Sequence, residues 1–403
     1  MWRYELNTYL YKIFIYFVSI SLLACSSPKA KKQKLEEKRQ EQREKDSLSL
    51  LYDSVQRNVE IDAFMQNLHR KSGFNGNVLV AKSGKIIYQN SFGWADYLHK
   101  DSLKITSKFE LASVSKPLTG LGILKLVEEK KIRLDQTIGD FYADFPYPGI
   151  TLEMLLSHRS GLPNYIYFSE EAWTDKKKAM TNADAMNLLI AKKPGRYGAP
   201  NGRFHYNNSN FMVLAAIIEK VTGQSFEEYM KETVFEPAGM VNTAVLSKAV
   251  YEDIPTDVVG HDRVWRRSVV QNYLDGPVGD KGIYSTVQDL FLLDIALKEG
   301  RIVDKNLLDS AYVPRSKPWH GYFSYGYGWR TFSPETAQIV YHTGWWHGFR
   351  NLYVRDLTND ITIVFLSNLV NGSLLRLDDL YKILKMPILR QNAYNSNGDF
   401  IAN

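Results

Sequence analysis

Cysteine is nearly absent from this chain, because Cys25 is the only one among its 403 residues. A lone cysteine excludes any disulfide within the chain. The sequence also lacks a repeat of fixed period, so we expect one large folded unit with appendages rather than an array of small units. A chain of this length can bury a sizeable core.

The net positive charge is small outside the N-terminal segment. The net charge is +6, but residues 26–45 contain eight Lys or Arg against four Glu, and residues 1–25 contain two basic residues against one acidic residue. The chain beyond residue 45 is therefore close to neutral. Proteins that bind nucleic acid concentrate their basic charge on the folded domain, so no nucleic-acid partner is expected.

The apolar run near the N-terminus is too short to cross a membrane. It extends from Ile13 to Leu23, eleven residues against the roughly 20 that a spanning helix needs. Arg3 and Lys12 precede it, so residues 1–24 are predicted to be an export signal.

The end of this signal resembles the lipobox of bacterial lipoproteins. The residues are Leu22-Leu23-Ala24-Cys25, and the resemblance implies that Cys25 is diacylated and becomes the mature N-terminus. Two acyl chains anchor a protein stably. We therefore expect an exported lipoprotein of the bacterial cell envelope, anchored to the membrane on its periplasmic side; the alternative is an incidental cysteine in a cleaved signal peptide.

A charged segment follows the cysteine. Nearly all residues from Ser26 to Ser49 are Lys, Glu, Gln, Arg or Ser, so this segment cannot bury enough apolar surface to become ordered. We expect residues 25–58 to form a lipidated, flexible tether, with a solvated helix as the alternative. The folded domain is expected at 59–385, followed by a C-terminal tail at 386–403.

Strand patterns occur at both ends of the expected domain, and helical patterns dominate from Ser113 to about Thr243. This order predicts an α/β (α+β) fold in which both ends of the chain form one antiparallel sheet, flanked by helices, with a mostly helical region inserted. The predicted strands are 77–81, 85–88, 339–341, 352–354 and 361–365, and the flanking helices are 61–68 and 374–384.

Ser113 and Lys116 stand at the start of a predicted amphipathic helix with Leu118, Leu121 and Leu124 on its apolar face. Residues three apart share a side of a helix. A serine hydroxyl is a poor nucleophile unless a neighbour takes its proton, and a lysine can do so when desolvation keeps it neutral. The helix N-terminus adds partial positive charge beside an attacked carbonyl. The segment therefore predicts a nucleophile with its base.

Two further segments accompany this pair. Tyr206 and Asn208 lie on a predicted loop before a buried helix, where a tyrosine can point into a cleft, and His342-Thr343-Gly344 ends a strand pattern. Chance copies of the two short spacings occur at Ser26–Lys29, inside the tether, and at Tyr88–Asn90, inside a strand. Context therefore selects Ser113 and Tyr206.

In this order, Ser113-x-x-Lys116, Tyr206-x-Asn208 and His342-Thr343-Gly344 resemble the three motifs of the serine β-lactamase and penicillin-binding-protein superfamily. The tyrosine-led second motif is similar to the class C branch, which includes D-alanyl-D-alanine carboxypeptidases, D-aminopeptidases and esterases. The resemblance covers roughly residues 59–370 and implies a β-lactamase-like fold and a reaction without a cofactor. Segments 155–163, 235–240 and 282–286 also resemble landmarks of this superfamily.

The resemblance implies a role for each residue. Ser113 would attack a carbonyl to form an acyl-enzyme, Lys116 and Tyr206 would share the proton transfers, and water would complete the hydrolysis. The substrate would be bound or oriented by Asn208, His342 and Gly344, and Asn208 would also hold Lys116. The oxyanion hole would be formed by the backbone N–H groups of Ser113 and Trp345.

His342 stands where the β-lactamases of this superfamily have a lysine. A lysine is a fixed charge suited to a substrate carboxylate, whereas a histidine near neutral pH is mostly uncharged. We therefore expect esterase or D-peptidase activity rather than efficient β-lactamase activity, with Arg350 as a candidate replacement cation. A structural histidine at a strand edge is the alternative for His342. His342 and His347 lack a third ligand, so no metal site is expected.

Other residues have more than one interpretation. The region 165–200, with Trp173 and a run of three lysines, lies between two motif segments and is either a cover over the site or a solvated loop and helix. His158 is expected to be a buried structural histidine.

The sequence thus predicts a serine hydrolase of esters, amides or D-amino-acid peptides, with a small-molecule or cell-wall peptide substrate. The alternative is a catalytically idle relative that binds envelope ligands or partners. The presence of Ser113, Lys116 and Tyr206 together favours the enzyme.

Overall fold

The computed structural model describes residues 58–264, 266–316 and 322–389, which all belong to one unit of the chain. The predicted signal peptide, Cys25 and the tether up to residue 57 lie outside these residues, as do 390–403. No helix within the described residues is long and apolar enough to cross a membrane.

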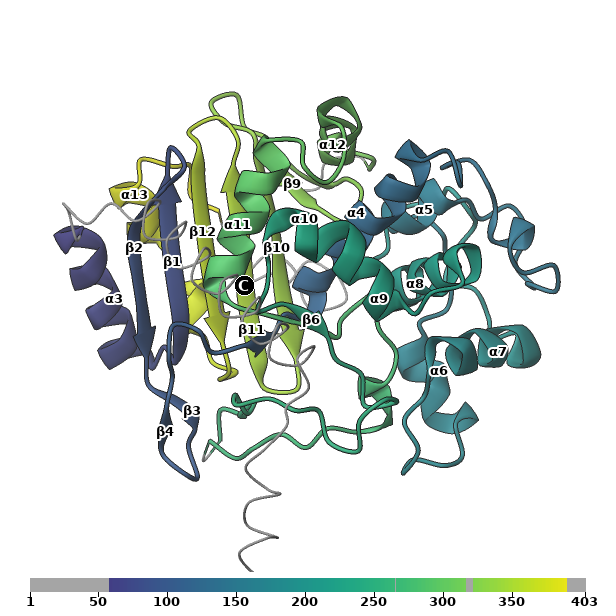
Figure 1. Cartoon of the computed structure of the whole chain (residues 1–403), viewed down its shortest axis with the longest axis horizontal. Helices are drawn as coiled ribbons and strands as arrows, with labels where there is room; N and C mark the ends of the chain where they lie inside the picture. Colours follow the sequence, from purple (N-terminus) through teal and green to yellow (C-terminus); the bar gives the residue numbers. More distant parts are fainter. Residues whose placement is uncertain (1–57, 265, 317–321, 390–403) are drawn as a thin grey trace, which may run out of the picture. The chain divides into compact units, whose positions relative to one another are not determined.

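An antiparallel sheet lies at the centre of this unit, with seven strands among the described residues (Figure 1). Its strand order is β2-β1-β12-β11-β10-β9-β8, so the N-terminal hairpin pairs directly with a strand from the other end of the chain. The predicted sheet formed by both ends of the chain is confirmed. The strands are β1 (Gly76–Lys82), β2 (Lys85–Phe92), β8 (Phe323–Tyr325), β9 (Arg330–Phe332), β10 (Ile339–Trp346), β11 (Phe349–Asp356) and β12 (Ile361–Ser367).

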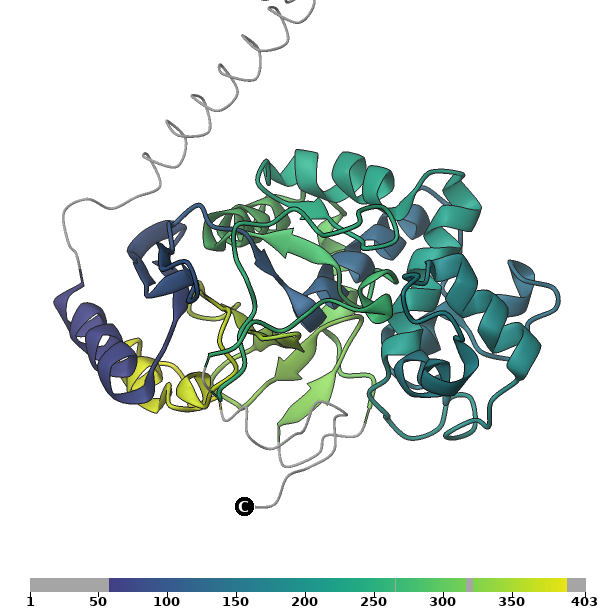
Figure 2. The same ribbon diagram turned by 90° about the horizontal axis from the view of Figure 1, so that it is seen from below.

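Helices cover both faces of this sheet, which explains why β12 is buried along its whole length. Ile363 and Phe365 belong to the core shared with α3 (Val59–Ser72) and α13 (Asp378–Ile383), two helices that pack against each other (Figure 2). Thr362, which lies between buried residues of β12 and points to the opposite face, donates a hydrogen bond from its hydroxyl to Asp294 on α11 (Val287–Lys298).

The inserted region is mostly helical, as predicted, and its central helix is α8 (Asn208–Thr222), which packs against α4, α5, α7 and α9. The side chain of Asn207 caps the start of α8 by accepting the N–H of Ser209, and Gly223 ends it in the left-handed conformation. The other helices are α4 (Ser115–Glu128), α5 (Leu152–Leu156), α6 (Tyr165–Ala172), α7 (Asn182–Lys192), α9 (Phe226–Met230), α10 (Glu236–Ala238) and α12 (Lys305–Tyr312).

Short strands complete the described part of the chain. β5 (Phe109–Glu110) and β6 (Ala244–Val245) both pair with β7 (Ile283–Ser285). β7 thus joins the segment before Ser113 to the segment that follows the helices of the inserted region. β3 (Trp94–Asp96) pairs with β4 (Asp101–Ser102).

Two boundaries differ from those predicted. The last predicted helix is a 3₁₀ turn at Ser373–Leu375 followed by α13. Met386 and Leu389 are buried in the core of the sheet and its helices, so residues 386–389 belong to the folded domain rather than to the expected C-terminal tail. These residues remain packed because their apolar side chains directly follow the last helix and are buried in the core.

Candidate active site

Ser113 lies in a 3₁₀ turn, Ala112–Val114, immediately before α4, so the helix begins just after the serine as predicted. This turn packs against β10 and β11. The residue before the serine, Ala112, has a φ of +51°, a backbone conformation that residues other than glycine rarely adopt. The serine therefore stands on a constrained turn between the sheet and the helical region.

Lys116 is fully buried and lies beside the serine. Its Nζ donates hydrogen bonds to Ser113 Oγ at 2.9 Å, to Asn208 Oδ1 at 2.8 Å and to the backbone oxygen of Asp280 at 3.0 Å. Three oxygen atoms thus surround the side-chain nitrogen of Lys116. The structure thus brings the first motif and Asn208 of the second motif into direct contact.

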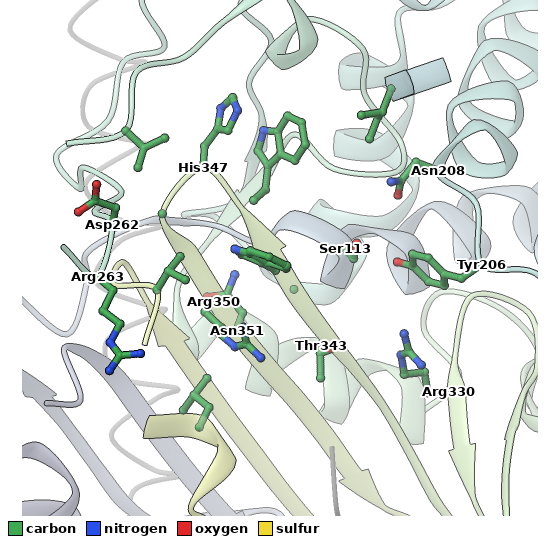
Figure 3. A pocket seen from close by; sticks show the side chains of 18 of the residues that line it. Ser113, Tyr206, Asn208, Asp262, Arg263, Arg330, Thr343, His347, Arg350 and Asn351 are labelled. Carbon is green, nitrogen blue, oxygen red and sulfur yellow. The ribbon is translucent and has the colours of Figure 1, made fainter. Parts of the chain in front are cut away.

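Tyr206 lies on the loop before α8, as predicted, and its side chain lines the same cavity as Ser113 and Asn208 (Figure 3). Lys116 Nζ is 4.9 Å from the centre of the tyrosine ring. The guanidinium carbon of Arg330 is 5.2 Å from that centre. Two cations therefore flank the tyrosine that is predicted to transfer protons.

His158 supports this tyrosine from behind. It is fully buried, with its ring centre 4.4 Å from that of Tyr206, and its Nδ1 accepts the backbone N–H of Asn207 at 3.2 Å. Burial, and then the charge of Lys116, lower its pKa well below the usual range, so the ring is neutral. This geometry fits the predicted structural role.

His342 does not line the cavity. It is fully buried on β10, its Nδ1 is 2.7 Å from the backbone oxygen of Thr343, and its Nε2 is 3.0 Å from the hydroxyl of Tyr325. A carbonyl only accepts, so Nδ1 carries the proton and Nε2 accepts from the tyrosine. Burial, and then Arg330 and Lys116, lower the pKa of His342 well below the usual range. Both ring nitrogens are already engaged and the side chain does not line the cavity, so this geometry favours the structural alternative over the expected role in orienting the substrate.

Arg330 is a cavity-lining residue that the sequence analysis missed. It lies on β9, pairs in register with Tyr341 of β10 and lines the cavity beside Tyr206. Its Nε is buried without a hydrogen-bond partner, and no carboxylate forms an ion pair with it among the described residues. The one available signal was a single charged residue in the aromatic segment 322–332. Arg330 therefore places a guanidinium in the cavity, which His342 does not line.

The cavity encloses about 520 Å³ and extends along β10 from Tyr341 to Trp346 and into the turn at His347 and Gly348. β9 pairs with β10 only through Ile339–Tyr341, so the cavity borders the remainder of that strand. Ile166 and Tyr167 of α6 line it, whereas the three lysines of the proposed cover do not. Ser113 and Trp345, the residues predicted to form the oxyanion hole, both line it as well.

Gly344 allows the close approach of β10 to the serine turn. A Cβ atom on this residue would lie 2.2 Å from the backbone oxygen of Leu111 and 3.2 Å from Cβ of Ala112. A side chain at this position would push apart the strand and the turn that carries the nucleophile. The small size of Gly344 therefore permits the close packing of β10 against the serine turn, and the residue also lines the cavity.

A second group of residues that the sequence analysis missed surrounds Lys116. Asp280, whose backbone oxygen accepts from Lys116, is buried, and its carboxylate accepts from the hydroxyl of Tyr165 at 3.1 Å. Lys281 is also buried and donates to the same hydroxyl at 2.7 Å. No group of three or more His, Cys, Asp or Glu side chains suited to a metal ion occurs within the described residues.

Comparison with known proteins agrees with this geometry. Residues 61–385 match the family described as Beta-lactamase. The chain is 35% identical to Penicillin-binding protein 4* of Bacillus subtilis over 322 residues, which cover 76% of this chain and 71% of that protein. It is also similar to a solved penicillin-binding protein from Bacillus halodurans (TM-score 0.69, 25% identity, 80% and 98% of the two chains). A D-amino acid amidase from Ochrobactrum anthropi shares the fold (TM-score 0.63, 21% identity, 76% and 88%).

Proposed function

Since the chain belongs to the Beta-lactamase family of serine hydrolases, we propose that it cleaves D-amino-acid peptides or amides whose leaving group carries a carboxylate. The observation that carries this proposal is the cavity shared by Ser113, Tyr206 and Arg330. A guanidinium without an acidic partner beside the catalytic groups favours a substrate carboxylate.

The proposed reaction uses contacts already present. Ser113 Oγ attacks the carbonyl carbon while its proton passes to the Lys116–Tyr206 pair, and the oxyanion is stabilised by the backbone N–H groups of Ser113 and Trp345. The C–N bond then breaks as the pair returns a proton to the leaving nitrogen. Water, deprotonated by the same pair, attacks the acyl-enzyme and frees Ser113.

Arg330 and Tyr206 define the leaving-group side in this proposal. The proton must reach the leaving nitrogen from Tyr206, and Arg330 lies against the same tyrosine ring. A carboxylate two or three bonds beyond that nitrogen would lie within reach of the guanidinium. The Bacillus subtilis relative is a penicillin-binding protein by name, which supports a ligand with this arrangement of amide and carboxylate.

The alternative of an idle binding protein is not favoured. Lys116 donates to Ser113 Oγ at 2.9 Å, and the tyrosine lies beside both. Nothing in a binding role requires a buried lysine aimed at a serine hydroxyl.

We also propose that the protein acts in the bacterial cell envelope, tethered through a lipid on Cys25. The lipobox-like residues before Cys25 support this location. The test is metabolic labelling with a palmitate analogue followed by membrane fractionation. Cys25→Ser should lose the label and leave the membrane fraction, and a wild-type protein that is unlabelled and wholly soluble would contradict the anchor alone.

The activity is tested by labelling the protein with a fluorophosphonate and with a fluorescent penicillin. Both should label the wild type, and Ser113→Ala should abolish labelling without changing the circular dichroism spectrum. Ser26→Ala, in the chance copy of the first motif, is the matched control and should label normally. Equal labelling of Ser113→Ala would refute the proposed nucleophile.

A further inference from the structure

Arg350 is a second guanidinium in the cavity, and the proposed mechanism does not use it. It lies on β11 directly opposite Trp345 of β10, and its guanidinium carbon is 5.7 Å from the centre of a Trp345 ring. Among the described residues no acidic side chain pairs with Arg350, and no hydrogen bond is formed by its guanidinium. Burial lowers its pKa, and no acidic neighbour raises it.

Arg350 and Arg330 lie toward opposite ends of the cavity. Their cross-strand partners on β10 are Trp345 and Tyr341, four residues apart, which corresponds to roughly 14 Å along a strand. An even separation places both partners on the same face of β10. Figure 3 shows Ser113 between the two groups, with Tyr206 and Arg330 on one side and Arg350 on the other.

The position of Tyr206 fixes which part of a substrate reaches each end. The leaving nitrogen must face Tyr206 to receive its proton, so the leaving group extends toward Arg330. The acyl group lies on the other side of the attacked carbonyl carbon, past Ser113, and extends toward Trp345 and Arg350. This orientation rests on the function proposed above.

We propose that Arg350 and Trp345 form a subsite for a carboxylate on the acyl part of the substrate. A guanidinium stacked over an indole is held in plane and can present two parallel N–H groups to a carboxylate. The subsite adds a second charge requirement. The substrate class becomes a D-amino-acid amide or peptide with one carboxylate on each side of the scissile bond.

The charges around this end agree with that class. Arg263 also lines it and has no ion-pair partner among the described residues. Asp262, the one carboxylate beside it, accepts the backbone N–H of Arg267. His347 lies 3.0 Å from Asp275, so this histidine already has an anion of its own. At this end of the cavity the two guanidinium groups of Arg350 and Arg263 thus face one carboxylate, that of Asp262, which leaves a net positive charge.

The test compares N-succinyl-D-alanine p-nitroanilide with N-acetyl-D-alanine p-nitroanilide. These substrates share a neutral leaving group, and the succinyl substrate carries an additional –CH2–COO⁻ group on the acyl side. Wild-type kcat/KM should favour the succinyl substrate by about five- to tenfold, and in Arg350→Gln the ratio of the two kcat/KM values should fall to about one. Arg133→Gln, which removes an exposed arginine paired with Asp135, is the matched control and should keep the preference.

A wild type without preference would overturn the subsite, and so would an Arg350→Gln variant that loses the same factor on both substrates, since that result indicates a structural role through Trp345. A second readout does not depend on turnover: N-succinyl-D-alaninamide should protect Ser113 from fluorophosphonate at lower concentration than N-acetyl-D-alaninamide does. Protection that differs while neither anilide is cleaved would retain the subsite. The proposed hydrolysis would be rejected only if N-acetyl-D-alanyl-D-alanine, whose leaving group carries a carboxylate, is not cleaved either. Equal protection would reject the subsite.

Discussion

The carboxylate of Glu110 accepts a hydrogen bond from the backbone N–H of Ala112 at 3.0 Å, one residue before the nucleophile. The same oxygen accepts the N–H of Gly282 at 2.9 Å, and the side chain is buried. The positive φ of Ala112 costs roughly 1–3 kcal/mol and persists only where neighbouring contacts enforce it. Glu110 thus holds the strained turn that aims Ser113 into the cavity.

Replacing Glu110 with alanine should lower the catalytic activity strongly, while the rest of the domain still folds. The variant loses both backbone bonds, so the turn can relax, and a displacement of about 1 Å at the nucleophile can cost about a hundredfold in rate. We expect kcat/KM to fall by roughly that factor. Glu110→Gln keeps an oxygen that accepts both N–H groups and should retain most activity. Full activity of the alanine variant would show that Glu110 does not position the serine.

The charge of Glu110 should also appear in the pH dependence of stability. Burial raises its pKa from 4.5 to about 7, opposed in part by the bond from Gly282. Between these values the unfolded chain releases a proton that the folded protein keeps. The contribution of Glu110 to the free energy of unfolding is therefore fully present below pH 4.5 and is lost as the pH rises to about 7, by an amount on the order of 3 kcal/mol.

Urea unfolding of wild type and Glu110→Gln between pH 4 and pH 8 measures this loss. Glutamine does not ionise, so the variant should gain stability relative to wild type as the pH rises through that window. His158 and His342, whose lowered pKa values destabilise the folded protein below about pH 6.5, act equally in both proteins and cancel in the difference. A difference that is flat with pH would contradict the raised pKa.

The sequence predicted the sheet and the cluster of motif residues around Ser113 because both leave local patterns. The strands 77–81 and 361–365 are apolar runs long enough to recognise, and Ser113, Lys116 and Asn208 meet as their motif spacing implies. β8 and β9 have three residues each, too few for a periodic signal. Arg330 could not be predicted, since its neighbour Tyr206 lies 124 positions away in sequence and the two meet only through the sheet.

Gly344→Ala should separate the strand from the nucleophile's turn. The added Cβ would lie 2.2 Å from the backbone oxygen of Leu111, and a backbone atom cannot move away as a flexible side chain can. We expect a loss of about 1–3 kcal/mol in stability and at least a hundredfold in kcat/KM. Gly195→Ala is the matched control, since a Cβ there meets nothing within 4 Å. Equal behaviour of the two variants would argue against close packing at Gly344.

His342→Lys should destabilise the protein without improving recognition of carboxylates. The site is buried, its polar groups are satisfied by Thr343 and Tyr325, and Arg330 and Lys116 already lower the pKa of the histidine. An added ammonium would be a buried charge without a partner, which costs about 3–5 kcal/mol. Thermal unfolding and the kcat/KM ratio of paired substrates with and without a carboxylate provide the check. A stable variant with a raised preference for carboxylates would place His342 in the substrate site.

Arg330→Gln should reduce hydrolysis of substrates in proportion to the charge of their leaving group. N-acetyl-D-alanyl-D-alanine and its C-terminal amide differ only in that charge, and a hydrogen bond to a charged group contributes about 1.5–3 kcal/mol, or roughly ten- to a hundredfold. The variant should lose this factor on the acid and much less on the amide, because the contact with the ring of Tyr206 affects both substrates equally. Arg350→Gln is the matched control, since it removes a guanidinium from the other end of the same cavity and should leave this ratio unchanged. If Arg330→Gln slows both substrates alike, Arg330 acts through Tyr206 and the carboxylate requirement at the leaving group is wrong. If Arg350→Gln changes the ratio instead, the orientation of the substrate in the cavity is reversed.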